Sequence, residues 1–298
     1  MKAVTGFSAL AVIILIFSKC EYPLDYEEVP IYQPYSSEYP ALEKKIREMY
    51  DSRAVFTWSQ YHDLLLELSS RKFLVLPLEK MRNTFNDSMV VVGFRHDIDW
   101  NPFKAIEMAK MEKDLGLRAT YFVLPTAYYY GTFYRSGLSR NACMDSVYME
   151  LFHYGAEIGI HNDLLTVMIE YKLDPFVFNR NELSYFRSLH IPVWGTASHG
   201  SPIAKATVPN YQIFSDYAKV GCVIYLGVSY PIGLHSLTEY GFNYEAYFIS
   251  FNKYFSESGG QWNNPGGLNG ILAELEKSVP GDRIEILTHP DWWGKKNN

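Results

Sequence analysis

The sequence predicts a mixed α/β fold, a (β/α) barrel in which helices surround a mainly parallel sheet. From Met89 onward, short apolar runs typical of strands alternate with amphipathic helical stretches, which is the pattern of repeated βα units. The strand-like runs are nearly continuously apolar, as expected for parallel strands that are covered on both faces. A barrel is favoured over an open doubly wound sheet because polar residues end predicted strands across the whole domain, whereas an open sheet would gather them at one switch point.

The individual elements follow from periodicity and from helix-end signals. Helices are expected at 41–50 and 58–69, before the alternation begins. The pair Asn101-Pro102 begins the next helix with a capping side chain and a proline in the first turn, and Gly116 ends it. The other expected elements are strands at 89–95, 118–124, 156–161, 193–199, 222–228, 246–249 and 283–288, and helices at 144–154, before residue 189 and at 268–277.

Residues 1–20 have the features of a bacterial export signal. Met1-Lys2 precedes an apolar run at 9–17, which is shorter than the roughly 20 residues of a membrane span. Cys20 stands where a lipoprotein signal is cleaved and lipidated, although Lys19 replaces the usual small residue. Lipidation at Cys20, simple signal cleavage and an uncleaved anchor all stay open.

The rest of the chain is expected to form one domain behind a spacer. Residues 21–40 are rich in Tyr, Pro, Glu and Ser without periodicity, and so predict an extended spacer. Residues 41–298 are long enough to form one large core. We therefore expect an exported protein of the cell envelope, periplasmic or on the outer surface, that meets a membrane only through its N-terminal lipid or signal anchor.

Composition excludes two classes of partner. The formal net charge is −6 and no long block of Lys or Arg occurs, so nucleic acid is not expected to bind. No glycine-rich dinucleotide motif or Walker A motif is present, which gives nucleotide cofactors no support. Aromatic residues make up 16% of the chain, a content that fits sugar-binding clefts but also ordinary cores and interfaces.

Four segments far apart in the chain place ionisable side chains at predicted strand ends. They are 95–99 (Arg-His-Asp-Ile-Asp), 158–161 (Ile-Gly-Ile-His), 196–200 (Thr-Ala-Ser-His-Gly) and 286–290 (Ile-Leu-Thr-His-Pro). Because the carboxyl ends of parallel strands meet at one end of a barrel, these side chains are expected to converge. Two carboxylates and three imidazoles in one place would make a metal site with room for acid–base chemistry.

The first segment predicts different roles for its two acids, Asp97 and Asp99. In an extended strand Arg95, Asp97 and Asp99 point to one side, whereas His96 and Ile98 point to the other. Neighbouring carboxylates repel unless a cation lies beside them, so one acid would bind a metal and the other would serve as a base. The alternative is structural, with one Asp capping the following helix and the other in a salt bridge.

Each histidine also has a structural alternative. His161 could be a hydrogen-bonded sheet residue and His199 a turn residue. His289 could simply pack beside Trp292-Trp293. The rings of these tryptophans would either stack on a sugar or fill part of the hydrophobic core. Asp163 is an alternative metal ligand, although capping of the following helix is the preferred role for it.

Taken together and in order, five motifs resemble the polysaccharide deacetylase superfamily, the metal-dependent carbohydrate esterases, and in particular a bacterial branch with an Arg-His-Asp-x-Asp first motif. The resemblance spans roughly residues 90–294. The motifs are 94–99 (Phe-Arg-His-Asp-Ile-Asp), 117–123 (Leu-Arg-Ala-Thr-Tyr-Phe-Val), 155–161 (Gly-Ala-Glu-Ile-Gly-Ile-His), 197–200 (Ala-Ser-His-Gly) and 289–293 (His-Pro-Asp-Trp-Trp).

The resemblance implies a distorted (β/α) barrel that holds a divalent metal, commonly zinc. It implies that Asp97 is the general base, that Asp99 and His161 bind the metal, and that His289 protonates the leaving amine. Arg95, Trp292 and Trp293 are expected to contact the substrate.

The chain departs from the family pattern at two places. Leu165 occupies the position of the usual second metal-binding histidine, and Ile98 separates two acids that are usually adjacent. His199 is preferred as the third ligand; Asp163 in that role, or a degraded site, are the alternatives.

The expected function is therefore hydrolysis of N-acetyl or related acyl groups on a cell-envelope or extracellular polysaccharide. Two alternatives stay open: a metal-dependent hydrolase of another C–N bond or of a phosphate bond, and a surface-anchored lipoprotein that binds carbohydrate without turnover.

Overall fold

The structure is a computed structural model that describes residues 39–296. The expectations for residues 1–20, for Cys20 and for most of the 21–40 spacer lie outside the described residues. The last two residues of that predicted spacer, Tyr39 and Pro40, already belong to the first helix. Among residues 39–296, no helix has the length and apolar character needed to cross a bilayer.

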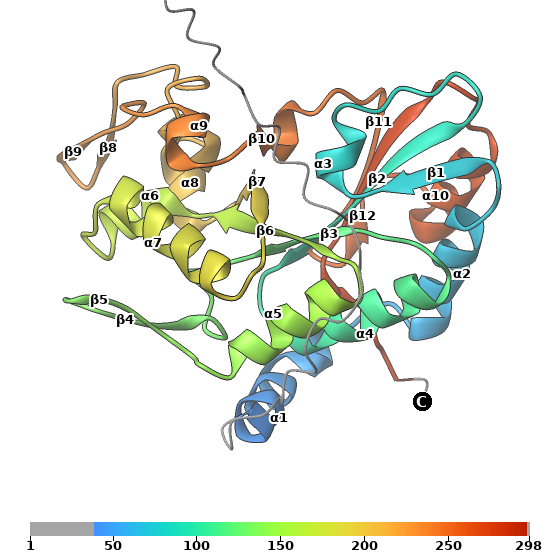
Figure 1. The fold of residues 1–298 in the computed structure, drawn as a ribbon, viewed down its shortest axis with the longest axis horizontal. Coiled ribbons are helices and arrows are strands. Elements are labelled where there is room, and N and C mark those ends of the chain that lie inside the picture. The colour runs from blue at the N-terminus through green and yellow to red at the C-terminus, as the bar shows by residue number, and fades with distance from the viewer. Residues whose placement is uncertain (1–38, 297–298) are drawn as a thin grey trace, which may run out of the picture. The chain divides into compact units, whose positions relative to one another are not determined.

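A curled sheet of nine mostly parallel strands forms the centre of the fold (Figure 1). Its order is β10-β7-β6-β3-β2-β13-β11-β12, with β1 beside the first half of β2; only β11 and β12 pair antiparallel. The strands are β1 (Phe73–Leu76), β2 (Val90–Ile98), β3 (Thr120–Val123), β6 (Glu157–Asn162), β7 (Val193–Ser198), β10 (Tyr244–Glu245), β11 (Lys253–Ser258), β12 (Gln261–Trp262) and β13 (Arg283–Thr288).

The mixed α/β class is confirmed, and the sheet forms a half-barrel. In the described part of the chain, β10 and β12 end the strand order without pairing to each other. This arrangement is compatible with a distorted barrel that does not close.

Helices and short turns complete the domain. The α-helices are α1 (Tyr39–Tyr50), α2 (Trp58–Leu68), α3 (Leu78–Met81), α4 (Pro102–Asp114), α5 (Met144–His153), α6 (Leu164–Ile169), α7 (Pro175–Ser188), α8 (Pro202–Ala206), α9 (Leu237–Tyr240) and α10 (Gly267–Glu276). The 3₁₀ turns are η1 (Asp51–Arg53), η2 (Asn210–Ile213), η3 (Ala246–Phe248) and η4 (Pro290–Trp292). The predicted start of α4 is confirmed, because the Asn101 side chain accepts a hydrogen bond from the backbone N–H of Lys104.

Parallel register aligns the carboxyl ends of the strands that carry the predicted site. His161 in β6 lies opposite Ala197 in β7, and His96 in β2 lies opposite Thr288 in β13. Close packing of β6 on β3 depends on Gly159, because a Cβ at that position would collide with the Phe122 ring. The ends of β2, β6, β7 and β13 therefore lie at one edge of the sheet.

Two predicted strands are wrong. The segment 246–249 forms the turn η3 instead of a strand, and its place in the sheet is taken by β10 and by the unpredicted β11. The segment 222–228 is not one strand but most of a hairpin, β8 (Cys222–Tyr225) and β9 (Val228–Pro231), outside the main sheet. A second unpredicted hairpin joins β4 (Gly131–Tyr134) to β5 (Gly137–Arg140).

Candidate metal centre

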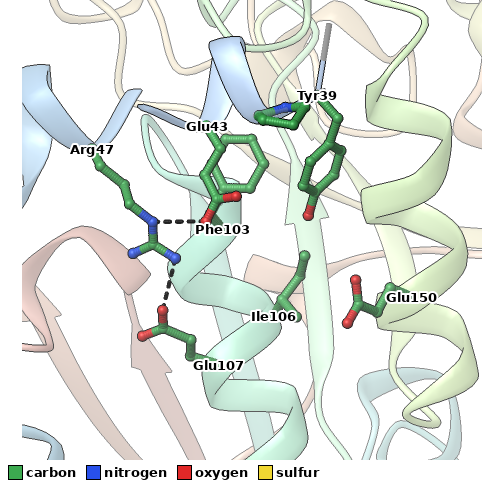
Figure 2. Close-up of a pocket in the computed structure, with 8 residues that line it drawn as sticks. Tyr39, Glu43, Arg47, Phe103, Ile106, Glu107 and Glu150 are labelled. Carbon is green, nitrogen blue, oxygen red and sulfur yellow. Dashed lines mark hydrogen bonds and ion pairs between the residues drawn. The ribbon is translucent and has the colours of Figure 1, made fainter. Parts of the chain in front are cut away.

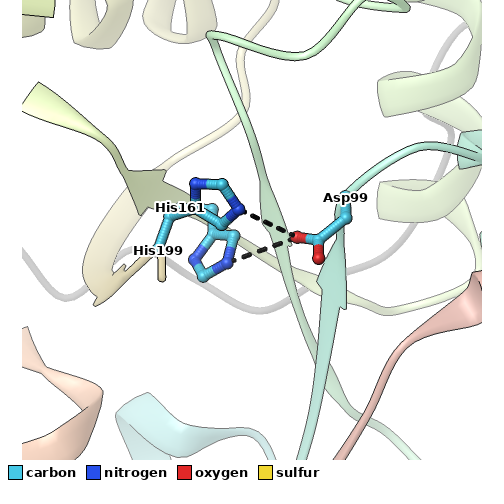
Figure 3. A group of neighbouring side chains, drawn as sticks. All are labelled: Asp99, His161 and His199. Atoms are coloured by element: carbon cyan, nitrogen blue, oxygen red, sulfur yellow. Dashed lines mark ion pairs between the residues drawn. The ribbon is translucent and has the colours of Figure 1, made fainter. Parts of the chain in front are cut away.

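Asp99, His161 and His199 come together at the carboxyl ends of β2, β6 and β7 (Figure 3). Each offers one ligand atom, and these atoms all lie within 4.8 Å of one another. Asp99 directly follows β2, His161 lies within β6, and His199 directly follows β7. Three segments separated by many residues therefore form one group that could bind a metal ion.

The two distances from Asp99 to the histidines are close to those between ligands that share a cation. The Oδ1 atom of Asp99 lies 3.5 Å from Nε2 of His161 and 3.8 Å from Nε2 of His199. Two ligands of a tetrahedral zinc ion, each bonded at about 2.0–2.1 Å, lie roughly 3.3 Å apart. The observed separations are too long for good hydrogen bonds but close to that value.

The buried Asp99 Oδ1 atom also has no hydrogen-bond partner. Burial opposes ionisation of Asp99, but the neighbouring His161, His289 and His199 hold the pKa of this carboxyl well below its usual range. An ionised, unpartnered carboxylate beside two imidazoles is a donor set that suits zinc and related divalent ions.

Neighbouring groups orient both imidazoles with Nε2 toward the centre. The Nδ1 atom of His161 lies 2.9 Å from the carbonyl oxygen of Ala197, to which it donates when the ring is neutral, and this leaves a lone pair on Nε2. The Nδ1 atom of His199 lies 3.5 Å from Oδ2 of Asp163. His161 therefore has a hydrogen-bond partner of the kind that metal-binding histidines commonly use. On His199 the Asp163 carboxylate lies on the corresponding side of the ring, at a distance longer than a good hydrogen bond.

Asp163 lies behind His199 and does not belong to the three-residue group. Its carboxylate accepts hydrogen bonds from the hydroxyl groups of Thr126 and Thr166 and from the side-chain amide of Asn210. Asp163 occupies the N-cap position of α6, but its side chain makes no capping hydrogen bond, so the preferred capping role is wrong. Its position is that of a partner for the imidazole of His199.

Asp97 is the second acid at the same strand end. Both oxygens of Asp97 accept hydrogen bonds from the Arg95 guanidinium, at 2.8 Å each, and Oδ2 lies 3.5 Å from Nε2 of His161. Burial alone would raise the pKa of Asp97, but Arg95 and His161 lower it below its usual value. Asp97 is therefore ionised at neutral pH next to the predicted metal ligands.

Arg95 is fully buried, and its contacts are internal. Besides the bidentate contact with Asp97, its Nη1 atom donates to Oε1 of Glu285 in β13, at 3.1 Å. The predicted alternation is confirmed, since Arg95 and Asp97 lie on one side of β2 while His96 faces Glu112 on the other. The expected contact of Arg95 with substrate does not fit this placement, because the described contacts use the guanidinium to hold Asp97.

His289 is held at the end of β13 by Glu257, a residue that the sequence analysis missed. The backbone N–H of His289 donates to Oε2 of Glu257 at 3.0 Å, and its Nδ1 atom lies 2.6 Å from the Glu257 carbonyl oxygen. Burial lowers the pKa of His289, but Glu257 and the charges of Asp99 and Asp97 outweigh it and raise the pKa to about 10. His289 is therefore protonated at neutral pH in this charge environment.

The raised pKa of His289 predicts a pH-dependent contribution to stability in the metal-free protein. The folded state binds the proton more tightly than the unfolded chain, whose histidine pKa is about 6.5. The contribution is fully present below about pH 6.5 and is lost as the pH rises through about 10. Urea unfolding with a chelator should therefore show the difference in unfolding free energy between wild type and His289→Gln shrinking from pH 6.5 to 10. A difference that stays constant would contradict this protonation state.

The two tryptophans of the last motif have different surroundings. Trp293 is fully buried against Phe56 and Tyr61, at ring-centroid distances of 4.8 and 4.9 Å, and is therefore a core residue. Trp292 is partly exposed and meets Trp100, the residue after Asp99, edge to face at 5.9 Å. Of the two, only Trp292 is partly accessible to solvent.

Asp291, between His289 and Trp292, is a second acidic group that the sequence analysis missed. It is fully buried, and burial together with the negative charge of Asp99 raises its pKa to about 7. Its position next to His289 was visible in the sequence, but its burial was not.

A separate cavity of about 450 Å³ lies between α1 and α4 (Figure 2). Arg47 lines this cavity and forms ion pairs with Glu43 and Glu107, at 2.9 and 2.8 Å. None of Asp99, His161 and His199 lines this cavity, so it is distinct from the candidate metal centre.

This edge of the sheet therefore brings together three residues that could bind a metal ion, an ionised carboxylate and a protonated imidazole. No protein-family model matches the chain, and a search of curated proteins finds no match. The resemblance to polysaccharide deacetylases therefore rests on the sequence motifs, and the site is interpreted from its own geometry.

Proposed function

We propose that the protein is a metal-dependent hydrolase that removes N-acetyl or related acyl groups from a cell-envelope or extracellular polysaccharide. The observation that carries this proposal is the grouping of Asp99, His161 and His199 with an ionised Asp97 beside them. Export to the cell envelope through residues 1–20 is part of the same proposal.

The proposed metal is zinc, held by Asp99, His161 and His199. Such an ion supplies Lewis-acid chemistry, polarising an acyl carbonyl and lowering the pKa of water. Three protein ligands of the nitrogen and oxygen type, as Asp99, His161 and His199 would supply, are the number that catalytic zinc sites commonly use.

The proposed proton transfers belong to Asp97 and His289. Asp97 accepts a proton from the attacking water, and the Arg95 guanidinium keeps its carboxylate oriented. A C–O bond forms from the water oxygen to the acyl carbon, and the C–N bond breaks. His289 donates its proton to the departing nitrogen, and both residues then return to their starting states by exchange with solvent.

A protonated His289 favours an amide substrate. An amine leaves poorly unless it is protonated, so hydrolysis of an N-acyl group needs a donor on the leaving-group side. His289 is such a donor in the metal-free protein: burial lowers its pKa, but Glu257 and the charges of Asp99 and Asp97 outweigh burial and raise the pKa to about 10.

Aromatic rings beside the centre support a sugar substrate. Trp100 lies in the chain next to Asp99, stacks with Tyr50 at 6.2 Å and meets Trp292 at 5.9 Å. All three rings are partly exposed. The Arg53 guanidinium lies 4.0 Å from the ring of Trp100 and 5.5 Å from that of Tyr50, so Trp292 is the ring we expect to stack on a sugar.

Removal of either proton-transfer group is expected to slow turnover strongly without removing the metal. Asp97→Asn and His289→Ala should each lower the rate of acetate release from an N-acetylated oligosaccharide by about 10²–10⁴-fold, the usual contribution of a general acid or base. Metal analysis of the same samples should give wild-type content. Either variant retaining wild-type turnover would contradict its assigned role.

The same assay separates the alternatives. Product from another amide or from a phosphate ester, with no acetate from glycans, would favour a hydrolase of a different bond. Glycan binding without any product in the metal-loaded protein would favour a carbohydrate-binding lipoprotein.

A further inference from the structure

The hairpin formed by β8 and β9 is the most apolar exposed segment of the described chain. Residues 220–234, Val-Gly-Cys-Val-Ile-Tyr-Leu-Gly-Val-Ser-Tyr-Pro-Ile-Gly-Leu, contain no charged side chain. The two strands pair only with each other and stand apart from the main sheet (Figure 1). The sequence analysis placed one buried strand here, and the proposed hydrolase chemistry does not use it.

One side of the hairpin packs on the domain and the other faces solvent. Val223 and Ile232 are buried in the core. Ile224, paired with Ser229 across the hairpin, is 70% exposed, and Leu226 at the tip is 87% exposed. Further exposed aliphatic residues in this segment are Val220, Val228 and Leu234. By the register of the hairpin, Ile224 and Val228 lie on opposite faces, on either side of the Leu226 tip. Single exposed aliphatic residues are ordinary, but five within fifteen residues, three of them at this tip, indicate an interaction surface.

The turn itself supports a role for the tip. Leu226 and Gly227 have φ angles of 48° and 78°, in the left-handed region. Glycine and asparagine adopt this conformation readily in two-residue hairpin turns, whereas leucine does so at a conformational cost. The backbone of Leu226 is thus in an unfavourable conformation at the most exposed point of the hairpin. No burial of its side chain in the core compensates for this cost.

Two exposed lysines, Lys172 and Lys219, lie at the base of this apolar element. Lys172 is exposed, donates a hydrogen bond to the hydroxyl group of Tyr230 at 2.6 Å and lies over the same ring. Lys219 is exposed and directly precedes the uncharged segment. An apolar tip with lysines behind it complements a bilayer with anionic head groups, where the tip meets the acyl chains and the lysines meet the phosphates.

The dimensions and shape agree with a lipid surface. A four-residue strand spans roughly 13 Å, which exceeds the about 5–10 Å depth at which interfacial elements insert. The largest exposure is at a narrow tip, whereas a stable interface between two copies needs a broader patch of about 800 Å² on each partner.

We propose that the β8–β9 hairpin is a membrane-contacting element that inserts Ile224, Leu226 and Val228 into the interface of an anionic bilayer. This contact is separate from the metal centre and from the anchor expected in residues 1–20. It would hold the domain against a lipid surface independently of the chemistry at Asp99.

The test compares full-length variants in co-sedimentation with vesicles of phosphatidylglycerol and phosphatidylcholine. Ile224→Ser/Leu226→Asn/Val228→Thr should lower the partition coefficient by roughly tenfold or more, because three aliphatic contacts are lost. Asparagine tolerates the left-handed turn, so the hairpin keeps its conformation, and an unchanged melting temperature checks this. The matched control, Val177→Thr/Val279→Thr, changes exposed aliphatic residues elsewhere and should bind like wild type.

Two further measurements test whether binding depends on anionic lipid and whether the hairpin instead joins two copies of the protein. Lys172→Gln/Lys219→Gln should weaken binding to the anionic vesicles and leave binding to phosphatidylcholine alone unchanged. Any binding through residues 1–38 is common to all these variants, so the differences report on the hairpin. Equal binding of the triple variant and wild type would overturn the proposal. So would a lipid-free wild-type dimer that the triple variant fails to form, since the patch would then join two copies.

Discussion

Asp99→Ala is expected to weaken zinc binding by more than about 100-fold, because loss of a residue that only hydrogen-bonds a metal ligand already costs about 10–100-fold. The fold should survive, because the Oδ1 atom of Asp99 accepts no hydrogen bond that the substitution would break. Titration calorimetry with zinc measures the affinity. In parallel, saturating zinc should raise the melting temperature of wild type and leave that of Asp99→Ala unchanged.

Two comparisons sharpen this prediction. Asp163→Asn keeps all three ligand atoms but weakens the partner of His199, and should cost about 10–100-fold in affinity. Asp63→Ala removes an exposed carboxylate in α2 and should change nothing. Wild-type zinc affinity in Asp99→Ala would show that the metal binds elsewhere.

Arg95→Ala is expected to destabilise the protein by about 3–5 kcal/mol, the cost of removing one partner from a buried ion pair. The substitution leaves Asp97 and Glu285 buried without their shared guanidinium. Without Arg95 the pKa of Asp97 rises, so protonation relieves the penalty, and the loss should be smaller at pH 5 than at pH 8. Urea unfolding of metal-free protein at both pH values measures it.

A surface ion pair provides the matched control for this prediction. Arg82 pairs with Glu79 at 2.8 Å, but both side chains are partly exposed, so Arg82→Ala should cost less than about 1 kcal/mol. Adding Glu285→Gln to Arg95→Ala should recover part of the lost stability, because one buried acid is removed. Equal effects of Arg95→Ala and Arg82→Ala would show that the buried pair does not hold β2 to β13.

The elements that could be predicted are those with continuous apolar runs and clear end signals. The strand 283–288 is confirmed at both ends, and the start of α4 at Asn101-Pro102 follows from local hydrogen bonding. By contrast, 246–249 is a four-residue apolar run, and runs this short do not distinguish strands from turns. The strand β11, next to the end of the sheet, was missed because Lys253–Ser258 is largely polar, and its place depends on pairing with β13.

The same distinction applies to the site. Asp99, His161 and His199 could be predicted because each follows or ends an apolar strand, and parallel strands bring their carboxyl ends together. Glu257 and Glu285 could not, because they contact His289 and Arg95 only through the register of β11, β13 and β2. Ligand positions are thus set by local pattern, whereas their supporting contacts are set by tertiary packing.

X-ray absorption at the zinc edge of the zinc-loaded protein tests the central claim most directly. The predicted spectrum shows nitrogen and oxygen ligands at about 2.0–2.1 Å, with the multiple scattering of two imidazoles and no sulfur near 2.3 Å. Asp99→Ala, His161→Ala and His199→Ala should each abolish that spectrum. Sulfur ligands, fewer than two imidazoles, or an unchanged spectrum in these variants would contradict a metal centre built from Asp99, His161 and His199.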